Sequence, residues 1–95
     1  MSGFVRISRD ILYTEWGSDA CTLSVFVHCL LKANLESGKQ WGKEYKRGQF
    51  ITNLQMLARE LGDLTEDIYK ALQCLASFGE LKVETLGKYY RITVK

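Results

Sequence analysis

Residues 54–75 read LQMLARELGDLTEDIYKALQCL and carry two runs of apolar residues at helical spacing. The i, i+3, i+4 repeat is that of a helix with one buried face, and Gly62 stands between the runs, where a left-handed backbone commonly ends a helix. We therefore predict two short helices joined by a tight turn. Thr52 or Asn53 is expected to cap the first helix, and Thr65 to cap the second, which closes at Phe78-Gly79. The expected buried positions are Leu54, Leu57, Ala58, Leu61, Ile68, Ala71, Leu72 and Leu75.

The residues after this helix pair alternate between apolar and polar side chains, which is typical of strands with one buried face. Leu86-Gly87-Lys88 supplies a turn, so residues 81–95 are predicted to form a β-hairpin. Upstream, Gln49-Phe50-Ile51 follows Gly48 and is predicted to be a third strand that pairs with this hairpin. The side chains expected to face inward from the hairpin are Leu81, Val83, Tyr90, Ile92 and Val94.

The longest predicted helix runs from a cap at Ser18 or Asp19 to about Asn34. Its expected buried face consists of Leu23, Phe26, Val27, Leu30 and Leu31, widened by Cys29, and its polar stripe consists of Ser24, His28 and Lys32. A helix that is apolar around most of its circumference packs on more than one neighbour or on a partner subunit.

The remaining segments give weaker signals. Gly3–Ile7 is short and β-rich, and Ser8 is expected to cap a brief helix that stops at Gly17. This brief helix would be supported by Ile11, Leu12 and Trp16. Residues 36–40 have loop composition, and residues 41–47 mix aromatic with basic side chains.

Two helices joined by a tight turn and followed by a hairpin predict an α+β fold of the winged helix-turn-helix type. We expect three to four helices and a small antiparallel sheet within one domain over residues 1–95. Both short helices would rest on the long helix, and the three strands would cover the remaining apolar side.

The composition excludes several classes of protein. The chain has 95 residues, 46% hydrophobic and 25% charged, with a formal net charge of +2, which matches an ordinary globular domain. No apolar run approaches the roughly 18 residues of a membrane span, and residues 1–7 lack the layout of a secretory signal. Three cysteines without C-x-x-C spacing favour the cytoplasm and simple packing roles. With one histidine and no phosphate-loop or nucleophile motif, we expect no enzymatic activity, metal or cofactor.

Six segments carry a resemblance to a known family; they are Gly3–Leu12, Leu30–Asn34, Arg47–Thr52, Leu57–Gly62, Ala71–Leu75 and Gly79–Leu81. Together they resemble the N-terminal winged-helix module of phage and mobile-element replication proteins, which is related to the DnaD-type primosomal proteins. The resemblance implies a DNA-binding module that oligomerises and recruits replication-machinery proteins. It also implies a longer natural chain, of which these residues are the N-terminal part.

In a winged helix, the exposed face of the helix over residues 65–77 enters the major groove of DNA. The candidate base-facing residues are Thr65, Tyr69, Lys70, Gln73 and Ser77. Gln73 is suited to adenine and Lys70 to guanine, whereas the hydroxyl side chains suit phosphates. The alternative is a solvated helix face. The local charge favours that alternative, because residues 63–80 carry the acids Asp63, Glu66, Asp67 and Glu80 against Lys70 alone.

Two flanking segments, residues 39–47 and 82–95, carry the opposite charge. If strand pairing brings them to one side, a basic edge forms around the acidic helix. The candidate phosphate contacts are then Lys43, Lys46, Arg47, Lys88 and Arg91. The alternative is solubilising charge on edge strands. The nearby aromatic residues Trp41, Tyr45, Tyr89 and Tyr90 either stack on unpaired bases or pack in the core and the hairpin.

The sequence therefore predicts a non-enzymatic module that binds double-stranded DNA, in replication initiation of a phage or mobile element or in transcription regulation. The alternative is the same scaffold used for self-association as a homodimer, or for docking a partner protein, without direct DNA reading. The acidic helix and the broad apolar surface of the long helix favour this alternative. His28 is expected at the surface or in a subunit contact.

Overall fold

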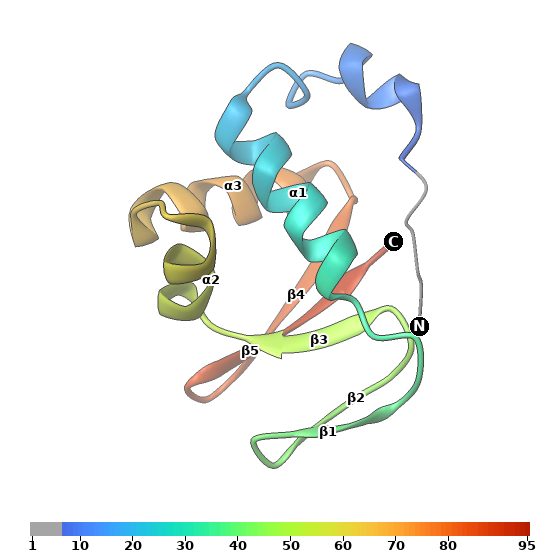
Figure 1. The fold of residues 1–95 in the computed structure, drawn as a ribbon, viewed down its shortest axis with the longest axis vertical. Helices are drawn as coiled ribbons and strands as arrows, with labels where there is room; N and C mark the ends of the chain where they lie inside the picture. Colours follow the sequence, from blue (N-terminus) through green and yellow to red (C-terminus); the bar gives the residue numbers. More distant parts are fainter. Residues whose placement is uncertain (1–6) are drawn as a thin grey trace.

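The structure, a computed structural model, describes residues 7–95 as a layer of helices on an antiparallel sheet (Figure 1). The helices are the 3₁₀ helix η1 (Arg9–Tyr13), α1 (Ala20–Lys32), α2 (Leu54–Leu61) and α3 (Thr65–Ser77). The strands are β1 (Gly38–Gln40), β2 (Lys43–Tyr45), β3 (Gln49–Thr52), β4 (Leu81–Leu86) and β5 (Tyr89–Val94). The predicted α+β class is confirmed, and the arrangement is compatible with a winged helix.

The helix pair forms where the apolar repeat predicts it. Asn53 caps α2, because its side-chain oxygen accepts a hydrogen bond from the Met56 backbone N–H at 2.9 Å. Gly62 ends α2 in the left-handed conformation, with a φ of 72°. The predicted cap of α3 is wrong by one residue: Leu64 holds the N-cap position without a side-chain bond, and Thr65 is the first helical residue.

The three-stranded sheet has the order β3-β5-β4, with both pairs antiparallel. Phe50 pairs with Ile92 in one ladder, and Leu86 pairs with Tyr89 at the closed end of the other. Gly87 and Lys88 therefore form a two-residue turn, and Gly87 supplies the positive φ of 65° that a first turn position of this kind requires. The predicted hairpin and its third strand are confirmed.

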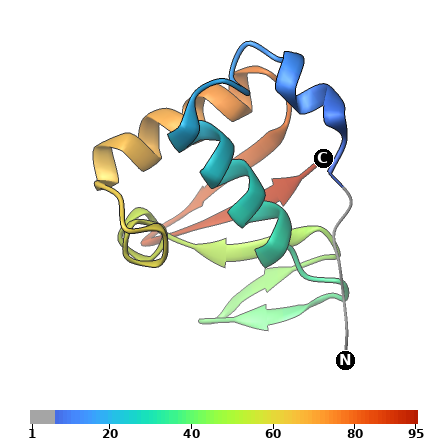
Figure 2. The same ribbon diagram turned by 45° about the horizontal axis from the view of Figure 1, so that its top comes forward.

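One face of this sheet packs against the helices and forms the core (Figure 2). Successive strand residues alternate between faces, so Phe50, Leu81 and Ile92 all point into the helical layer, where each is buried. They meet Leu57 from α2 and the buried face of α3, which consists of Ile68, Ala71, Leu72 and Leu75. The predicted inward side chains Val83, Tyr90 and Val94 are partly buried against the same core.

The predicted buried face of α1 is rotated relative to the observed one. The buried residues of α1 are Thr22, Val25, Phe26 and Cys29, while Leu31 is 64% exposed. Apolar residues occupy nearly every side of this helix, so their spacing alone does not fix which side faces inward. Tertiary packing decides it, because α1 contacts α3 and the buried residues Val25, Phe26 and Cys29 join the same core as the buried face of α3. The helix also ends at Lys32 rather than at Asn34.

The short helix before α1 ends earlier than the sequence predicts. The Ser8 side chain caps η1 as expected, by accepting from the Asp10 backbone N–H, but η1 ends at Tyr13 and excludes Trp16. Trp16 is instead buried against the Phe26 ring, with centroids 5.1 Å apart. Gly17 permits this compact path, because a Cβ at that position would collide with the Ile11 carbonyl oxygen. The predicted strand at Gly3–Ile7 lies, except for its last residue, outside the described part of the chain.

In the β1–β2 hairpin, residues 38–40, which have loop composition, form β1, and they pair with β2 at residues 43–45, for which the sequence predicts no element. Gly38 pairs with Tyr45, and the Tyr45 ring lies where a side chain at Gly38 would project. The hairpin lies against β3 on the side of the sheet away from the helices (Figure 2). Ile51 points to that side and is nevertheless only 2% exposed. The hairpin therefore creates a second, smaller buried region that the sequence did not reveal.

Candidate nucleic-acid interface

A groove runs between α3 and the β4–β5 hairpin. Its first part is a pocket of about 140 Å³, lined by Tyr69, Leu72, Gln73, Ala76, Val83, Thr85 and Tyr90. Its second part, of about 300 Å³, reaches the hairpin turn and is lined by Asn53, Leu54, Gln55, Thr65, Thr85, Gly87, Lys88 and Tyr90. Thr85 and Tyr90 line both parts, so the groove is continuous from the middle of α3 to the turn.

Three of the five predicted base-facing residues line this groove. Thr65, Tyr69 and Gln73 follow one another at four-residue intervals, which places them on one face of α3. The Gln73 amide donates a hydrogen bond to the Tyr69 hydroxyl at 3.0 Å. That bond fixes the amide plane and leaves the second N–H and the carbonyl oxygen of Gln73 free for another partner.

The other two predicted base-facing residues are not brought into the groove. Lys70 lines a separate pocket between α1 and α3, together with Asp19, Cys21 and Asp67. The Ser77 hydroxyl donates to the Cys74 carbonyl oxygen of its own helix at 2.7 Å. The groove therefore presents Gln73 without Lys70.

Two of the acids that oppose DNA binding lie on the α1 side of α3. The Cys21 sulfur is 3.9 Å from a carboxylate oxygen of Asp63 and 3.9 Å from the backbone oxygen of Asp67. Burial raises the pKa of the Cys21 thiol, and the nearby carboxylates of Asp63, Asp19 and Asp67 raise it further. Lys88 is the one charged residue among those lining the described groove. None of the four acids that the sequence assigns to this region is among the residues lining the groove, although Glu66 directly follows Thr65 in α3.

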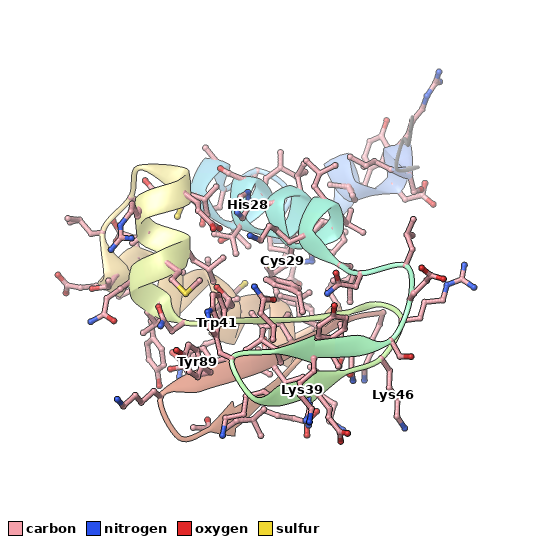
Figure 3. The ribbon with its side chains drawn as sticks, turned by 60° about the horizontal axis from the view of Figure 1, so that its bottom comes forward. His28, Cys29, Lys39, Trp41, Lys46 and Tyr89 are labelled. Atoms are coloured by element: carbon pink, nitrogen blue, oxygen red, sulfur yellow. The ribbon has the colours of Figure 1, made fainter. Side chains whose placement is uncertain are left out.

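The predicted basic residues do not gather around the groove. Lys88 lies at its end, in the β4–β5 turn. Lys46 and Arg47 precede β3 at the opposite end of the sheet, where Gln49 pairs with Thr93. Thr93 comes five positions after Lys88 in the chain, which corresponds to about 17 Å of strand. Figure 3 shows Lys46 at the end of the sheet away from Tyr89. The basic residues expected to form one edge therefore lie at two opposite ends of the sheet, Lys88 at one end and Lys46 and Arg47 at the other.

Arg91, in the middle of β5, and Lys43, the first residue of β2, are half-buried. Arg91 Nε donates to the Glu44 carbonyl oxygen at 2.8 Å, and its terminal nitrogen is 3.4 Å from Glu84. These bonds tie the β1–β2 hairpin to the sheet, so the Arg91 side chain is already engaged within the protein.

The residues that the sequence left out of the site are Asn53, Gln55, Thr85 and Tyr90, which also line the groove. Tyr90 was assigned to the core, and its partial burial agrees with that prediction while leaving part of the ring on the groove. Asn53 and Gln55 lie at the start of α2. The starts of α2 and α3 both lie beside the hairpin turn. The order of a helix pair followed by a hairpin, which can be read from the sequence, is the feature that could have identified Asn53 and Gln55.

His28 and the cysteines lie outside the groove. His28 Nε2 donates to one Glu60 carboxylate oxygen at 2.8 Å, and Lys32 donates to the other at 3.1 Å, so the polar stripe of α1 contacts α2. Burial raises the pKa of the Cys29 thiol to about 12, which keeps it protonated and suited to packing. Within residues 7–95, no cluster of three or more His, Cys, Asp or Glu side chains could hold a metal ion.

None of the helices described between residues 7 and 95 has the length and apolarity needed to cross a membrane. No protein-family model, curated protein or solved structure matches the chain.

Proposed function

We propose that this chain is a winged-helix module that binds double-stranded DNA, with α3 facing the major groove and the β4–β5 turn acting as the wing. The observation that carries the proposal is that Thr65, Tyr69, Gln73 and Lys88 line one continuous groove. The order α1, β3, α2, α3, β4, β5 supports it, because a helix pair followed by a hairpin is the winged arrangement of the helix-turn-helix. The resemblance to phage and mobile-element replication modules favours replication initiation, with transcription regulation as the other setting.

Each groove residue has a chemical role in this proposal. Lys88 contacts a phosphate, since it is an exposed cation at the tip of the hairpin. Gln73 reads adenine, because a side-chain amide matches the N6 donor and N7 acceptor of that base in the major groove. Tyr69 holds the Gln73 amide in position, and Thr65 contacts the backbone from the first turn of α3.

The proposal is tested by fluorescence anisotropy of a labelled random duplex at low salt, with charge reversals at the two ends of the sheet. Lys88→Glu is expected to weaken binding and to reduce the slope of log affinity against log salt by about 1 or more. Lys46→Glu is the matched control, because it reverses the same charge on an exposed lysine remote from the groove. Gln73→Ala is expected to leave random-duplex binding nearly unchanged and to relax the preference at one base pair by about 1–3 kcal/mol.

Two outcomes contradict this proposal. One is the absence of salt-dependent duplex binding by the wild-type chain. The other is a larger loss from Lys46→Glu than from Lys88→Glu, because it would place the phosphate contacts at the opposite end of the sheet.

Self-association is the second candidate function, and a separate surface favours it. Leu31, in the last turn of α1, and Leu35, just beyond that helix, are 64% and 76% exposed. Large apolar side chains exposed close together often mark contacts between proteins. A homodimer formed through these residues would leave the α3 groove open, so this candidate is compatible with DNA binding.

A further inference from the structure

Trp41 and Tyr89 form an aromatic pair on the surface, on the side of the sheet away from the helices. Their ring centroids are 5.1 Å apart, and their planes differ by 7°, so the rings are stacked. Trp41 comes from the turn between β1 and β2, and Tyr89 is the first residue of β5 (Figure 3). Trp41 remains 45% exposed although one side of its indole is against Tyr89, whereas Trp16 is 3% exposed.

The turn does not explain why a tryptophan stands at this position. Gln40 pairs with Lys43, so Trp41 and Gly42 form a two-residue turn, and both have positive φ values, of 49° and 74°. Asparagine, aspartate or glycine at the first position satisfies such a turn best, and a bulky residue there is an outlier. Backbone strain of this kind is concentrated at binding and catalytic sites. Neither burial nor the backbone conformation accounts for a tryptophan at position 41. The exposed ring therefore indicates a binding role.

The charge around the pair selects the kind of ligand. Within two residues of either ring the chain carries Lys39, Lys43, Lys88 and Arg91, and no acid. Arg91 is held by Glu84 and the Glu44 carbonyl, and Lys39 stands opposite Glu44 in the β1–β2 ladder, which leaves Lys43 and Lys88. A stacking surface with lysines adjacent to it in the chain matches a strand of nucleic acid, whose bases stack on aromatic rings and whose phosphates attract lysines. The same charge disfavours a cationic ligand such as a methylated lysine.

We infer that the stacked Trp41–Tyr89 pair binds an unpaired base of single-stranded DNA. The inference deepens the proposed function and rests on it, because Lys88 lies between the duplex groove and Tyr89 in the hairpin. Thr85, Lys88 and Tyr90 line the groove, while Tyr89 points to the other face of the sheet. A duplex in the groove and a single strand on the aromatic pair would then lie on either side of one hairpin, as at a junction between duplex and unpaired DNA.

The experiment uses fluorescein-labelled oligothymidine and a strand of equal length that carries abasic sites, with binding followed by anisotropy. Trp41→Asn removes the ring and supplies a residue that the turn favours, so the variant is expected to fold at least as stably as the wild type, as thermal unfolding would check. It is expected to bind oligothymidine about five- to hundredfold more weakly, with little change for the abasic strand. Tyr13→Asn is the matched control, because Tyr13 is an exposed aromatic residue in η1 and is expected to leave both affinities unchanged.

Unchanged oligothymidine binding by Trp41→Asn would overturn the inference, and so would an equal loss for the thymidine and abasic strands, which would indicate phosphate contacts alone. The inference would also be overturned if the wild-type chain bound anionic vesicles through Trp41 and did not bind oligothymidine. Duplex titrations separate this inference from the proposed function. A folded Trp41→Asn variant that keeps wild-type duplex affinity but loses oligothymidine binding supports the inference. Gln73→Ala tests the duplex site through its base preference, because Gln73 lines the groove and is not among the cations beside the aromatic pair.

Discussion

Cys29 lies on the buried face of α1, in the core that α1 shares with α3, and its side chain has no exposed surface. Its thiol pKa is raised to about 12, first by burial and then by the charge of Glu60. Thiols react as thiolates, so this cysteine is protected both by its neighbours and by its protonation state. Cys21 and Cys74 are only partly buried.

We predict that iodoacetamide at pH 8 labels Cys74 and, more slowly, Cys21 in the folded protein, while Cys29 is labelled only after unfolding in urea. Peptide mass spectrometry of the alkylated chain measures this order. Labelling of Cys29 at the rate of Cys74 without denaturant would show that the α1–α3 contact opens readily, contrary to the packing described.

Single residues differ in how far the sequence reveals their roles. Asn53 and Gly62 were predictable, because capping and a left-handed helix end depend on residue type and immediate neighbours. Gly38 was not, because its role depends on the Tyr45 ring across the β1–β2 ladder. For Trp41 the sequence predicts either stacking on an unpaired base or packing and does not decide between them, because the ring against which it stacks is 48 positions later in the chain.

At the scale of elements, the contact between α1 and α2 depends on a small polar network. Glu60 accepts hydrogen bonds from His28 and Lys32. Partial burial acts to raise the pKa of Glu60, but the bonds from His28 and Lys32 outweigh it and hold that pKa below its usual range. A carboxylate whose pKa is lowered by folding stabilises the folded state above its unfolded pKa, and loses that contribution as the pH falls through the folded value.

Glu60→Gln is therefore expected to lower the free energy of unfolding near pH 6 by at most about 1 kcal/mol, because the pair is solvent-accessible. The difference from the wild type should shrink as the pH falls below the ordinary glutamate pKa and through the lowered pKa of Glu60, where the carboxylate becomes protonated. Urea unfolding at several pH values measures it, and Glu36→Gln, at an exposed position after α1, is the control. A pH-independent difference would contradict the role given to this carboxylate.

The elements themselves were predictable where one face alone is apolar. Periodicity identified α2, α3 and the β4–β5 hairpin, because their buried and exposed residues alternate clearly. It failed for α1, where apolar residues on several sides leave the orientation to tertiary packing. It also missed β1 and β2, which are three residues each and hold Gly38 and two lysines in place of an apolar pattern.

At the scale of the whole molecule, tertiary structure separates charges that the sequence presents together. The acids Asp63 and Asp67 lie toward α1, Lys46 and Arg47 lie at one end of the sheet, and Lys88 lies at the other. Half of the candidate interface, the face of α3, was predictable from helical spacing. The distribution of cations was not, because it depends on strand register and on the direction of β3.

The central claim is that duplex DNA contacts the groove between α3 and the β4–β5 turn. Its most direct measurement is the change in backbone amide NMR shifts of the ¹⁵N-labelled chain on titration with a short duplex. We predict that the largest shifts occur at Thr65, Tyr69, Gln73 and Lys88, with little change at Lys46 and Arg47. Shifts confined to Lys46 and Arg47, or found only at Leu31 and Leu35 as the protein is concentrated without DNA, would contradict the claim.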